Sequence, residues 1–421
     1  MMRSTILILS VALAVFALSS CQDKAPLSEE VVRSEMQRNP SAAHIDGLEG
    51  TLKWNYTSGL ELKAFLDVYV CDKGDVAGGI SGQGHFSGTG MKYQSHGARS
   101  MENILSYVDA WYDAIIAEDG TIGVNYKKSN YSTDHICPGR TLFQLYDLTG
   151  KEKYRLAMDR LYEQVLEQPR TPEGGFWHKQ VYPNQMWLDG LYMAQPFYAE
   201  YTARYVPDSL KMRNFADIAH HFVTVADHTF DPTTGLYRHA WDSSHEMFWC
   251  DPATGQSAHA WGRALGWYAM ALVEVLPVLP EDTPGRDEML RIFRHIFETL
   301  PQYADPGTGM WYQVLDRPAA EGNYLEATCS CMFVYAMLRG CREGYLDCQA
   351  DAEKAYRNLI KTFVSRERGV VDLNRCCEVA GLGGKENRSG DYDYYIHENV
   401  RSNDPKGIGP LIWAALEYEK R

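Results

Sequence analysis

A repeated pattern of glycines and apolar helices constrains the fold of this chain more than any other feature. Five times a turn glycine leads into a short apolar or aromatic segment, with 52 to 74 residues between successive glycines, at Gly123, Gly175, Gly235, Gly309 and Gly369. After a polar loop, each segment is followed by a strongly apolar helical stretch, at 139–148, 191–205, 264–279, 327–338 and 407–418. Four of these stretches precede a more amphipathic helix, at 152–166, 210–226, 286–303 and 351–364, and an earlier pair at 54–70 and 101–118 begins the series.

Two-helix repeats of this length cannot bury their apolar faces alone and must stack on their neighbours. Six such units, the last of them incomplete, close into a ring with the apolar helices inside and the amphipathic helices outside. Hydrophobic residues make up 45% of the chain, which is enough for a large core. The sequence therefore predicts an all-α fold, an (α/α)6 barrel that forms one catalytic domain over residues 43–421.

The repeat also predicts where a functional site lies. If the outer helices return the chain to the face from which the inner helices begin, all inner-helix N-termini share one rim. Six polar side chains fall at or near such starts: Asp134, Asp189, His259, Arg263, Glu326 and Asp404. A single carboxylate there can be a simple helix cap. Six polar groups that converge on one aromatic-lined mouth are typical of an active site.

The segment 174–193 carries the strongest functional signal. Two aromatic residues, His178 and Lys179 are followed by Trp187 and Asp189 at the start of an apolar helix. Flat rings pair with the faces of pyranose sugars, and a few polar groups fix the orientation of the ligand. The alternative is a solvated loop that enters an N-capped helix, with Asp189 as the cap. The pattern favours a carbohydrate-binding active site.

The N-terminus predicts export. Arg3 precedes an apolar stretch at 6–18 that is too short to span a bilayer and is typical of a signal peptide, here residues 1–20. The sequence Leu18-Ser19-Ser20-Cys21 resembles a bacterial lipoprotein cleavage box, which makes Cys21 the lipidated residue. An ordinary signal cut with an incidental Cys21 is the alternative. Residues 21–42 are then a tether, and a lipid anchor is the predicted contact with the membrane, at the periplasm or the cell surface.

Composition narrows the choice of partners. The formal net charge of −14 and the lack of a basic stripe argue against a nucleic-acid partner. Cys341 and Cys348 bracket a short polar turn between two helices, so a disulfide is possible in an exported protein. No paired CxxC clusters occur, and neither a metal site nor a cofactor is expected. The Gly-rich segment 72–99 breaks the repeat and is interpreted as a solvated loop.

The chain resembles the unsaturated rhamnogalacturonyl hydrolases, glycoside hydrolase family 105. The resemblance runs from about residue 54 to the C-terminus and is carried by Gly175-Phe176-Trp177-His178-Lys179, Gln185-Met186-Trp187-Leu188-Asp189-Gly190, His239-Ala240-Trp241-Asp242 and Gly322-Asn323-Tyr324-Leu325-Glu326. It implies that Asp189 is the general acid and base and that Asp134 also lines the pocket. The implied substrate contacts are His178, Lys179, Trp187, His239, Arg263 and Trp267. The sequence departs from the family at Arg263-Ala264-Leu265-Gly266-Trp267, where the family often has Arg-Gly-Asn-Gly-Trp.

The resemblance implies an unusual hydrolysis. The substrate is an oligosaccharide left by a polysaccharide lyase, whose terminal uronic acid has a C4=C5 double bond. Asp189 protonates C4, water adds at C5, and the resulting hemiketal opens and expels the next sugar, so one carboxyl group suffices. Arg263, Lys179 and the His residues are expected to hold the uronate carboxylate, Arg263 through a bidentate fork. Two alternatives stay open: an inverting hydrolase of saturated glycosides that uses Asp134 and Asp189 as a pair, and a non-catalytic glycan-binding lipoprotein.

Overall fold

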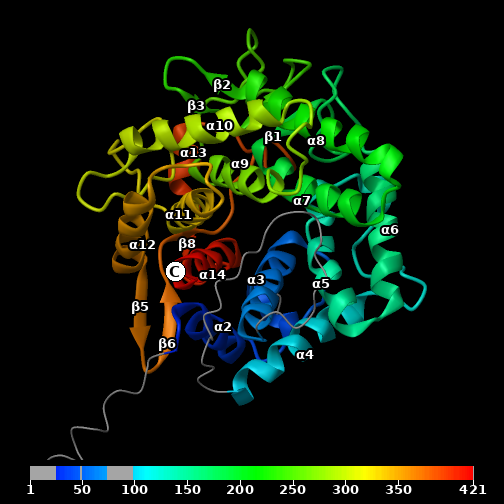
Figure 1. Ribbon diagram of the computed structural model, residues 1–421. Coiled ribbons are helices and arrows are strands. Elements are labelled where there is room, and N and C mark those ends of the chain that lie inside the picture. The colour runs from blue at the N-terminus through cyan, green and yellow to red at the C-terminus, as the bar shows by residue number, and fades with distance from the viewer. Residues whose placement is uncertain (1–24, 48–49, 74–97, 421) are drawn as a thin grey trace, which may run out of the picture.

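Six helices stand side by side in a closed ring in the computed structural model, which describes residues 25–47, 50–73 and 98–420. These inner helices are α3 (Tyr56–Lys73), α5 (Gly139–Thr149), α7 (Leu188–Tyr205), α9 (Gly262–Val275), α11 (Ala327–Arg342) and α14 (Pro405–Glu419). Each packs against the next, and α14 packs against α3, which closes the ring (Figure 1). The predicted (α/α)6 barrel is confirmed.

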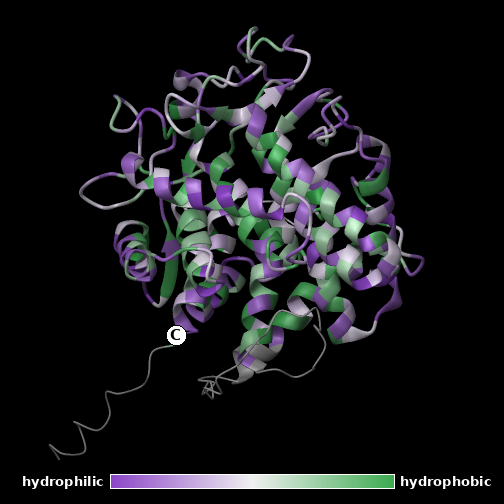
Figure 2. Ribbon diagram, turned by 45° about the horizontal axis from the view of Figure 1, so that its top comes forward, coloured by the Kyte–Doolittle hydropathy of each residue, from purple (hydrophilic) through white to green (hydrophobic). Residues whose placement is uncertain are grey.

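A second set of helices surrounds the ring, each packed against one or two inner helices. They are α4 (Ala98–Ile115), α6 (Glu152–Glu167), α8 (Asp208–Thr229), α10 (Arg286–Thr299), α12 (Gln349–Phe363) and α2 (Leu27–Arg38). Burial follows the sequence pattern, because α9 is buried along its whole length whereas α10 buries one face. The buried residues of α10 include Met289, Ile292, Phe293, Ile296 and Phe297, a spacing that places them on one side of a helix. Figure 2 shows this alternation of hydrophilic and hydrophobic residues along the outer helices.

The sixth outer helix corrects the predicted tether. Residues 21–42 were expected to be a polar tether, but α2 forms from Leu27 to Arg38 and packs against α14, α3 and strand β6 (Val370–Leu373). Val31 and Val32 are fully buried, and the hydroxyl of Ser28 donates a hydrogen bond of 2.5 Å to the carboxylate of Glu419. The folded domain therefore includes residues 27–38, and α2 is the main outer partner of the last inner helix, α14.

Glycine allows close contact between inner helices. A Cβ atom on Gly266 of α9 would lie 2.7 Å from the sulfur of Met332 on α11, closer than real Cβ contacts. The two helices are thus in contact through the backbone of α9 at this position. Such contacts keep the ring narrow, and its interior is filled by side chains.

Short elements between the helices build the rim. In the described part of the chain, four two-stranded antiparallel sheets pair β1 (Gln185–Trp187) with β4 (Ala240–Asp242), β2 (Phe230–Asp231) with β3 (Leu236–Tyr237), β5 (Val364–Glu367) with β6 (Val370–Leu373), and β7 (Cys376–Cys377) with β8 (Val400–Arg401). Turns of 3-10 helix lie at η1 (Ala42–Gly47), η2 (Lys128–Asn130), η3 (Thr133–His135) and η4 (Leu300–Tyr303), and α13 spans Tyr392–His397. These elements supply the backbone groups that connect one helix start to the next.

The segments before successive inner helices are joined by backbone hydrogen bonds. The donors and acceptors are Thr133 N to His178 O, Leu188 N to His239 O, His239 N to His259 O, Gly262 N to Gln313 O and Ala327 N to Arg375 O. These bonds bring the starts of α5, α7, α9 and α11 to one face of the barrel. The predicted common rim therefore exists, and it carries Asp134 and Asp189.

Several predictions about the ends and loops lie outside the described residues. The signal peptide, Cys21 and residues 74–97 of the Gly-rich segment belong to these parts. Within the described ranges, every helix is too short or too polar to cross a bilayer.

Candidate active site

Asp189 is the second residue of α7, where the chain turns from strand β1 into the helix. The pairing of β1 with β4 places Trp187 opposite Ala240, and the amide of Leu188 donates to the carbonyl of His239. Asp189 and His239 are thereby brought together from positions 50 residues apart in the sequence. Their side chains are 13% and 0% exposed. The local fold therefore holds a carboxyl group and an imidazole against each other at the rim.

The contact between these two side chains is incomplete. Oδ2 of Asp189 lies 3.2 Å from Nε2 of His239, but the two atoms are not aligned as a hydrogen bond, and within the described residues neither has another hydrogen-bonding partner. The other ring nitrogen, Nδ1, lies 2.7 Å from the hydroxyl of Tyr395. Buried polar atoms without partners are costly in a folded protein. A pair of them on one rim is typical of a site that completes its hydrogen bonds with substrate.

Asp134 has a different environment, because it forms an ion pair with Lys179. Burial would raise the pKa of Asp134, but the Lys179 ammonium and the nearby His178 hold the pKa of this carboxyl below its usual range. Burial would likewise lower the pKa of Lys179, and Asp134 raises it above the ordinary value. Asp134 is therefore a carboxylate and Lys179 an ammonium at neutral pH.

His178 lies between the two acids. Its Nε2 is 3.6 Å from Oδ1 of Asp134, and its Nδ1 is 3.2 Å from the hydroxyl of Thr133. A Cβ atom on Gly190, the neighbour of Asp189, would lie 3.1 Å from the same Nδ1, so the ring packs tightly against the backbone of α7. Burial lowers the pKa of His178 to about 4, in spite of Asp134. His178 is thus neutral at neutral pH and connects the surroundings of Asp134 and Asp189.

Two predicted stacking residues are buried in the structure. Trp187 is 7% exposed and lies parallel to His178 at 4.5 Å, with Tyr182 stacked on it at 5.0 Å. Trp267 is 1% exposed and packs against Tyr192 at 4.7 Å inside the ring. Neither ring presents a free face for a sugar in this conformation. Trp187 fixes the position of His178, and Trp267 belongs to the core.

Arg263 does not occupy the mouth, which corrects the prediction of a carboxylate clamp. Its side chain is 1% exposed. Its Nε donates to the hydroxyl of Thr328 at 2.9 Å, a terminal nitrogen donates to the carbonyl of Cys377, and Glu326 lies 3.7 Å away. The guanidinium group of Arg263 therefore connects α9 with α11 and with strand β7 through hydrogen bonds. The face of α9 that carries Arg263 points toward α11, which the spacing to Trp267 could not reveal.

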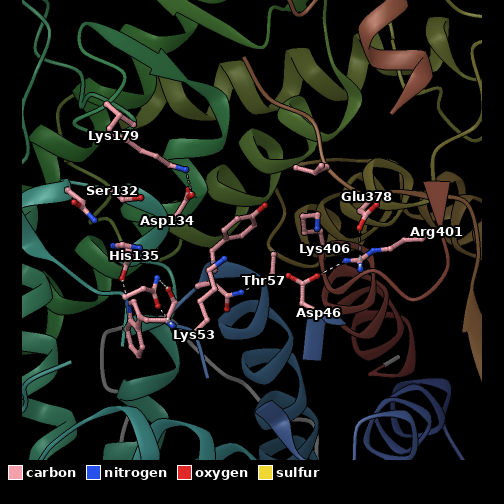
Figure 3. A pocket seen from close by; sticks show the side chains of 17 residues that line it. Asp46, Lys53, Thr57, Ser132, Asp134, His135, Lys179, Glu378, Arg401 and Lys406 are labelled. Atoms are coloured by element: carbon pink, nitrogen blue, oxygen red, sulfur yellow. Dashed lines mark hydrogen bonds and ion pairs between the residues drawn. The ribbon is translucent and has the colours of Figure 1, made fainter. Parts of the chain in front are cut away.

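A cavity of about 600 Å³ opens at the rim, a typical size for a small-ligand site. Asp134 and Lys179 line it, whereas His178, Trp187, Asp189, His239, Arg263 and Trp267 are not among its lining residues. Further lining residues come from the first and last inner repeats and include Asp46, Lys53, Tyr56, Glu378, Arg401 and Lys406 (Figure 3). Sequence reasoning missed these six, although Tyr56 and Lys406 stand at inner-helix starts, where the repeat places functional residues.

Tyr56 is a further polar residue that lines the cavity, together with Asp134. Burial, together with Asp134, Asp404 and Asp189, raises the pKa of its hydroxyl well above the ordinary value. The hydroxyl therefore stays protonated and can donate a hydrogen bond to an oxygen of a ligand. The rim thus combines an ion-paired carboxylate and a phenol at the cavity with an adjacent neutral imidazole and with an acid whose buried oxygen has no hydrogen-bonding partner among the described residues.

Comparison with known proteins agrees with this architecture. The family model described as Glycosyl Hydrolase Family 88 matches residues 83–421. A glycoside hydrolase from family 105 of C. acetobutylicum ATCC 824 superimposes with a TM-score of 0.82 at 38% identity, over 94% of this chain and 99% of that one. The unsaturated rhamnogalacturonyl hydrolase YesR of Bacillus subtilis is 28% identical over 275 residues, which are 63% of this chain and 70% of the relative.

A more distant structure shares the fold alone. The unsaturated glucuronyl hydrolase from Bacillus sp. GL1 is 12% identical, with a TM-score of 0.59 over 93% of this chain and 95% of that one. The barrel and its rim of carboxylates therefore define a six-hairpin glycoside hydrolase. More narrowly, the chain belongs to glycoside hydrolase family 105, the family of the C. acetobutylicum structure.

Proposed function

We propose that the protein removes a 4,5-unsaturated uronic acid from the non-reducing end of lyase-generated oligosaccharides by hydrating the C4=C5 double bond. One observation carries this proposal: Asp189 is the rim carboxyl with a buried oxygen that lacks a hydrogen-bonding partner among the described residues, whereas Asp134 is committed to Lys179. An enol ether needs one group that first gives a proton and then takes one from water. The asymmetry of the two acids fits this single-carboxyl chemistry.

The steps balance as a hydration. Asp189, protonated, gives its proton to C4, and the positive charge that develops at C5 is shared with the ring oxygen. Water adds to C5 and returns a proton to the carboxylate. The hemiketal at C5 then opens to a ketone, the hydroxyl freed at C1 forms an aldehyde, and the sugar attached at C1 leaves as an alcohol. The net change is one water consumed for each uronic acid released.

His239 supports both protonation states of Asp189. Burial raises the pKa of Tyr395 well above the ordinary value, so its hydroxyl can donate to Nδ1 of His239 or accept from it. With the proton on Nε2, the imidazole faces the Asp189 carboxylate. With the proton on Nδ1, it offers a lone pair to the protonated acid. The Asp189–His239–Tyr395 chain thus accommodates the acid form before the proton transfer and the base form after it.

We propose a galacturonyl-rhamnose product of rhamnogalacturonan lyases as the substrate. The similarity to YesR, an unsaturated rhamnogalacturonyl hydrolase, supports this choice. The direct experiment is to incubate the protein with lyase-generated rhamnogalacturonan and heparin oligosaccharides and follow the enol-ether absorbance. Loss of absorbance with the first substrate is expected. Turnover of only the second would assign a glucuronyl substrate, and turnover of neither would contradict the proposed function.

The paired-carboxylate alternative remains testable on the same protein. An inverting hydrolase would use Asp134 as base and Asp189 as acid, and it would cleave saturated glycosides. The ion pair of Asp134 with Lys179 makes it a weaker base, which disfavours this reading. Activity on saturated oligosaccharides of the same composition would support the alternative.

We also propose that the mature protein is an exported lipoprotein anchored through Cys21. The supporting features are the apolar stretch at 6–18 and the sequence Leu18-Ser19-Ser20-Cys21. Radiolabelled palmitate should enter the wild-type protein in a bacterial host and should not enter the Cys21→Ser variant. Equal labelling of both proteins would contradict the anchor.

A further inference from the structure

The cavity has charged side chains on two sides. Figure 3 shows Asp134 and Lys179 on one side and Asp46, Glu378 and Arg401 on the other. The first side belongs to the rim that carries Asp189, because η3 leads into α5 and hydrogen-bonds to residue 178. An acid sugar held for reaction would place its carboxylate near this side. The chain has a net charge of −14, so an anionic substrate needs a local cation.

Most cations of the cavity are already neutralised. Lys179 pairs with Asp134. Arg401 contacts Asp46 at 2.5 Å and Asp404 at 2.6 Å, and the ammonium of Lys406 lies 2.8 Å from Asp404. Arg263, the expected clamp, is buried and bonded to backbone and side-chain oxygens. None of these groups is a free partner for a substrate carboxylate.

Lys53 is different. It lines the cavity and is exposed, and among the residues that the structure describes no carboxylate lies within ion-pair distance of its ammonium. It lies near the reaction side, because it lines the same cavity as Asp134 and Lys179. The next residue, Trp54, also contacts the 3-10 turn that carries Asp134.

The backbone around Lys53 is held firmly. The amide of Trp54 donates to the side-chain oxygen of Asn125 at 2.7 Å, and the side-chain nitrogen of Asn125 donates to the carbonyl of Trp54 at 3.0 Å. The indole of Trp54 donates to the carbonyl of His135 at 2.8 Å. The residue after Lys53 is thus fastened on two sides, and one of its bonds ends on the 3-10 turn that carries Asp134. Lys53 is an anchored cation on the rim.

We propose that Lys53 binds the carboxylate of the unsaturated uronic acid, in the role that the sequence pattern assigned to Arg263. This inference rests on the proposed function. The ammonium would place the uronate beside Asp134 and Lys179, with its C4=C5 bond toward Asp189. Lys53 acts by binding and takes no part in proton transfer.

The test compares Lys53→Met with Lys354→Met, a control on the exposed face of outer helix α12. With the uronate substrate, Lys53→Met should raise KM about fivefold or more and change kcat much less, the range expected for an exposed ion pair strengthened by a hydrogen bond. Lys53→Arg keeps the charge and should recover most of the affinity. With the methyl ester of the same substrate, wild type and Lys53→Met should have equal KM values.

Each outcome decides the question. An unchanged KM in an active Lys53→Met protein overturns the inference and leaves the proposed function standing. A raised KM that persists with the methyl ester also overturns it, because Lys53 would then contact another part of the substrate. Inactivity of the wild-type protein on every unsaturated uronide would contradict the proposed function itself. Calorimetric binding of the uronate substrate to Asp189→Asn, with and without Lys53→Met, checks the affinity without turnover.

Discussion

The carboxyl oxygen Oδ2 of Asp189 and the ring nitrogen Nε2 of His239 lie 3.2 Å apart, buried and not aligned as a hydrogen bond. Strand pairing between β1 and β4 sets this distance, because it fixes the residue before α7 against the segment that carries His239. An acid and base catalyst needs a neighbour that is compatible with both of its protonation states, and the imidazole of His239 is such a neighbour. It also needs an oxygen that can contact the substrate, and Oδ2 of Asp189 is available for this contact.

Replacement of Asp189 by Asn tests the role of this oxygen. Asparagine keeps the size of the side chain but carries no transferable proton, so kcat should fall by about 10²–10⁴-fold or more. Circular dichroism and substrate binding should stay near the wild-type values. Asp208→Asn, at the exposed start of outer helix α8, is the matched control and should be fully active. Substantial activity in Asp189→Asn would exclude the single-carboxyl mechanism.

The architecture was largely predictable because glycine turns and apolar stretches repeat along the chain. The outer helix α2 was not, because several of its buried residues are polar: Ser28, Glu29, Ser34 and Glu35. Their burial depends on partners at the far end of the chain, such as Glu419, and no local periodicity reveals such partners. The predicted tether was wrong for this reason.

The site was predictable in part. Asp134, His178, Lys179, Asp189 and His239 gather at the rim, as their positions before inner helices indicated. The side of the cavity that Asp46 and Arg401 form was not predicted. These two residues lie 355 positions apart in the sequence, and only the closure of the ring brings them into contact. The direction in which a buried helix face points is likewise a tertiary property.

Lys179→Met should make the activity more sensitive to acid. In the wild-type protein the pKa of Asp134 lies below 3.8, so the carboxylate is ionised, and its contribution to stability is lost only as the pH falls through that lowered value. Without the Lys179 ammonium, burial dominates and raises the pKa of Asp134. The acid limb of the kcat/KM profile should move to higher pH. The control Lys128→Met, which removes a surface ion pair with Glu167, should not shift the acid limb of the profile. If the acid limb of Lys179→Met also stays in place, Lys179 does not control the protonation of Asp134.

Arg263→Lys should chiefly affect stability. Lysine loses the planar fork that reaches Thr328 and the Cys377 carbonyl, which leaves buried oxygens short of donors. We expect a loss of about 1–3 kcal/mol in the free energy of unfolding, measured with denaturant. KM should change little at a temperature where the variant is folded. A raised KM with an unchanged free energy of unfolding would instead indicate that Arg263 binds the substrate.

Cys341 and Cys348 should form a disulfide under oxidising conditions. Their sulfur atoms lie 3.4 Å apart, at the end of α11 and at the N-cap of α12. Glutathione disulfide should accept two electrons from the pair and release two glutathione thiols. The product should be two hydrogens lighter, resist alkylation at both positions and be stabilised by about 2–3 kcal/mol relative to Cys341→Ser. Alkylation of both thiols after oxidation would exclude the crosslink.

The most direct test of the hydration mechanism is turnover in heavy water. If Asp189 protonates C4, each released uronic acid carries one deuterium at C4, and the enol-ether absorbance falls in proportion to the sugar released. Mass spectrometry and proton NMR of the product measure both quantities. One deuterium at C4 for every bond cleaved is the predicted result. Release of a uronic acid that keeps its double bond and has no deuterium at C4 would contradict the mechanism.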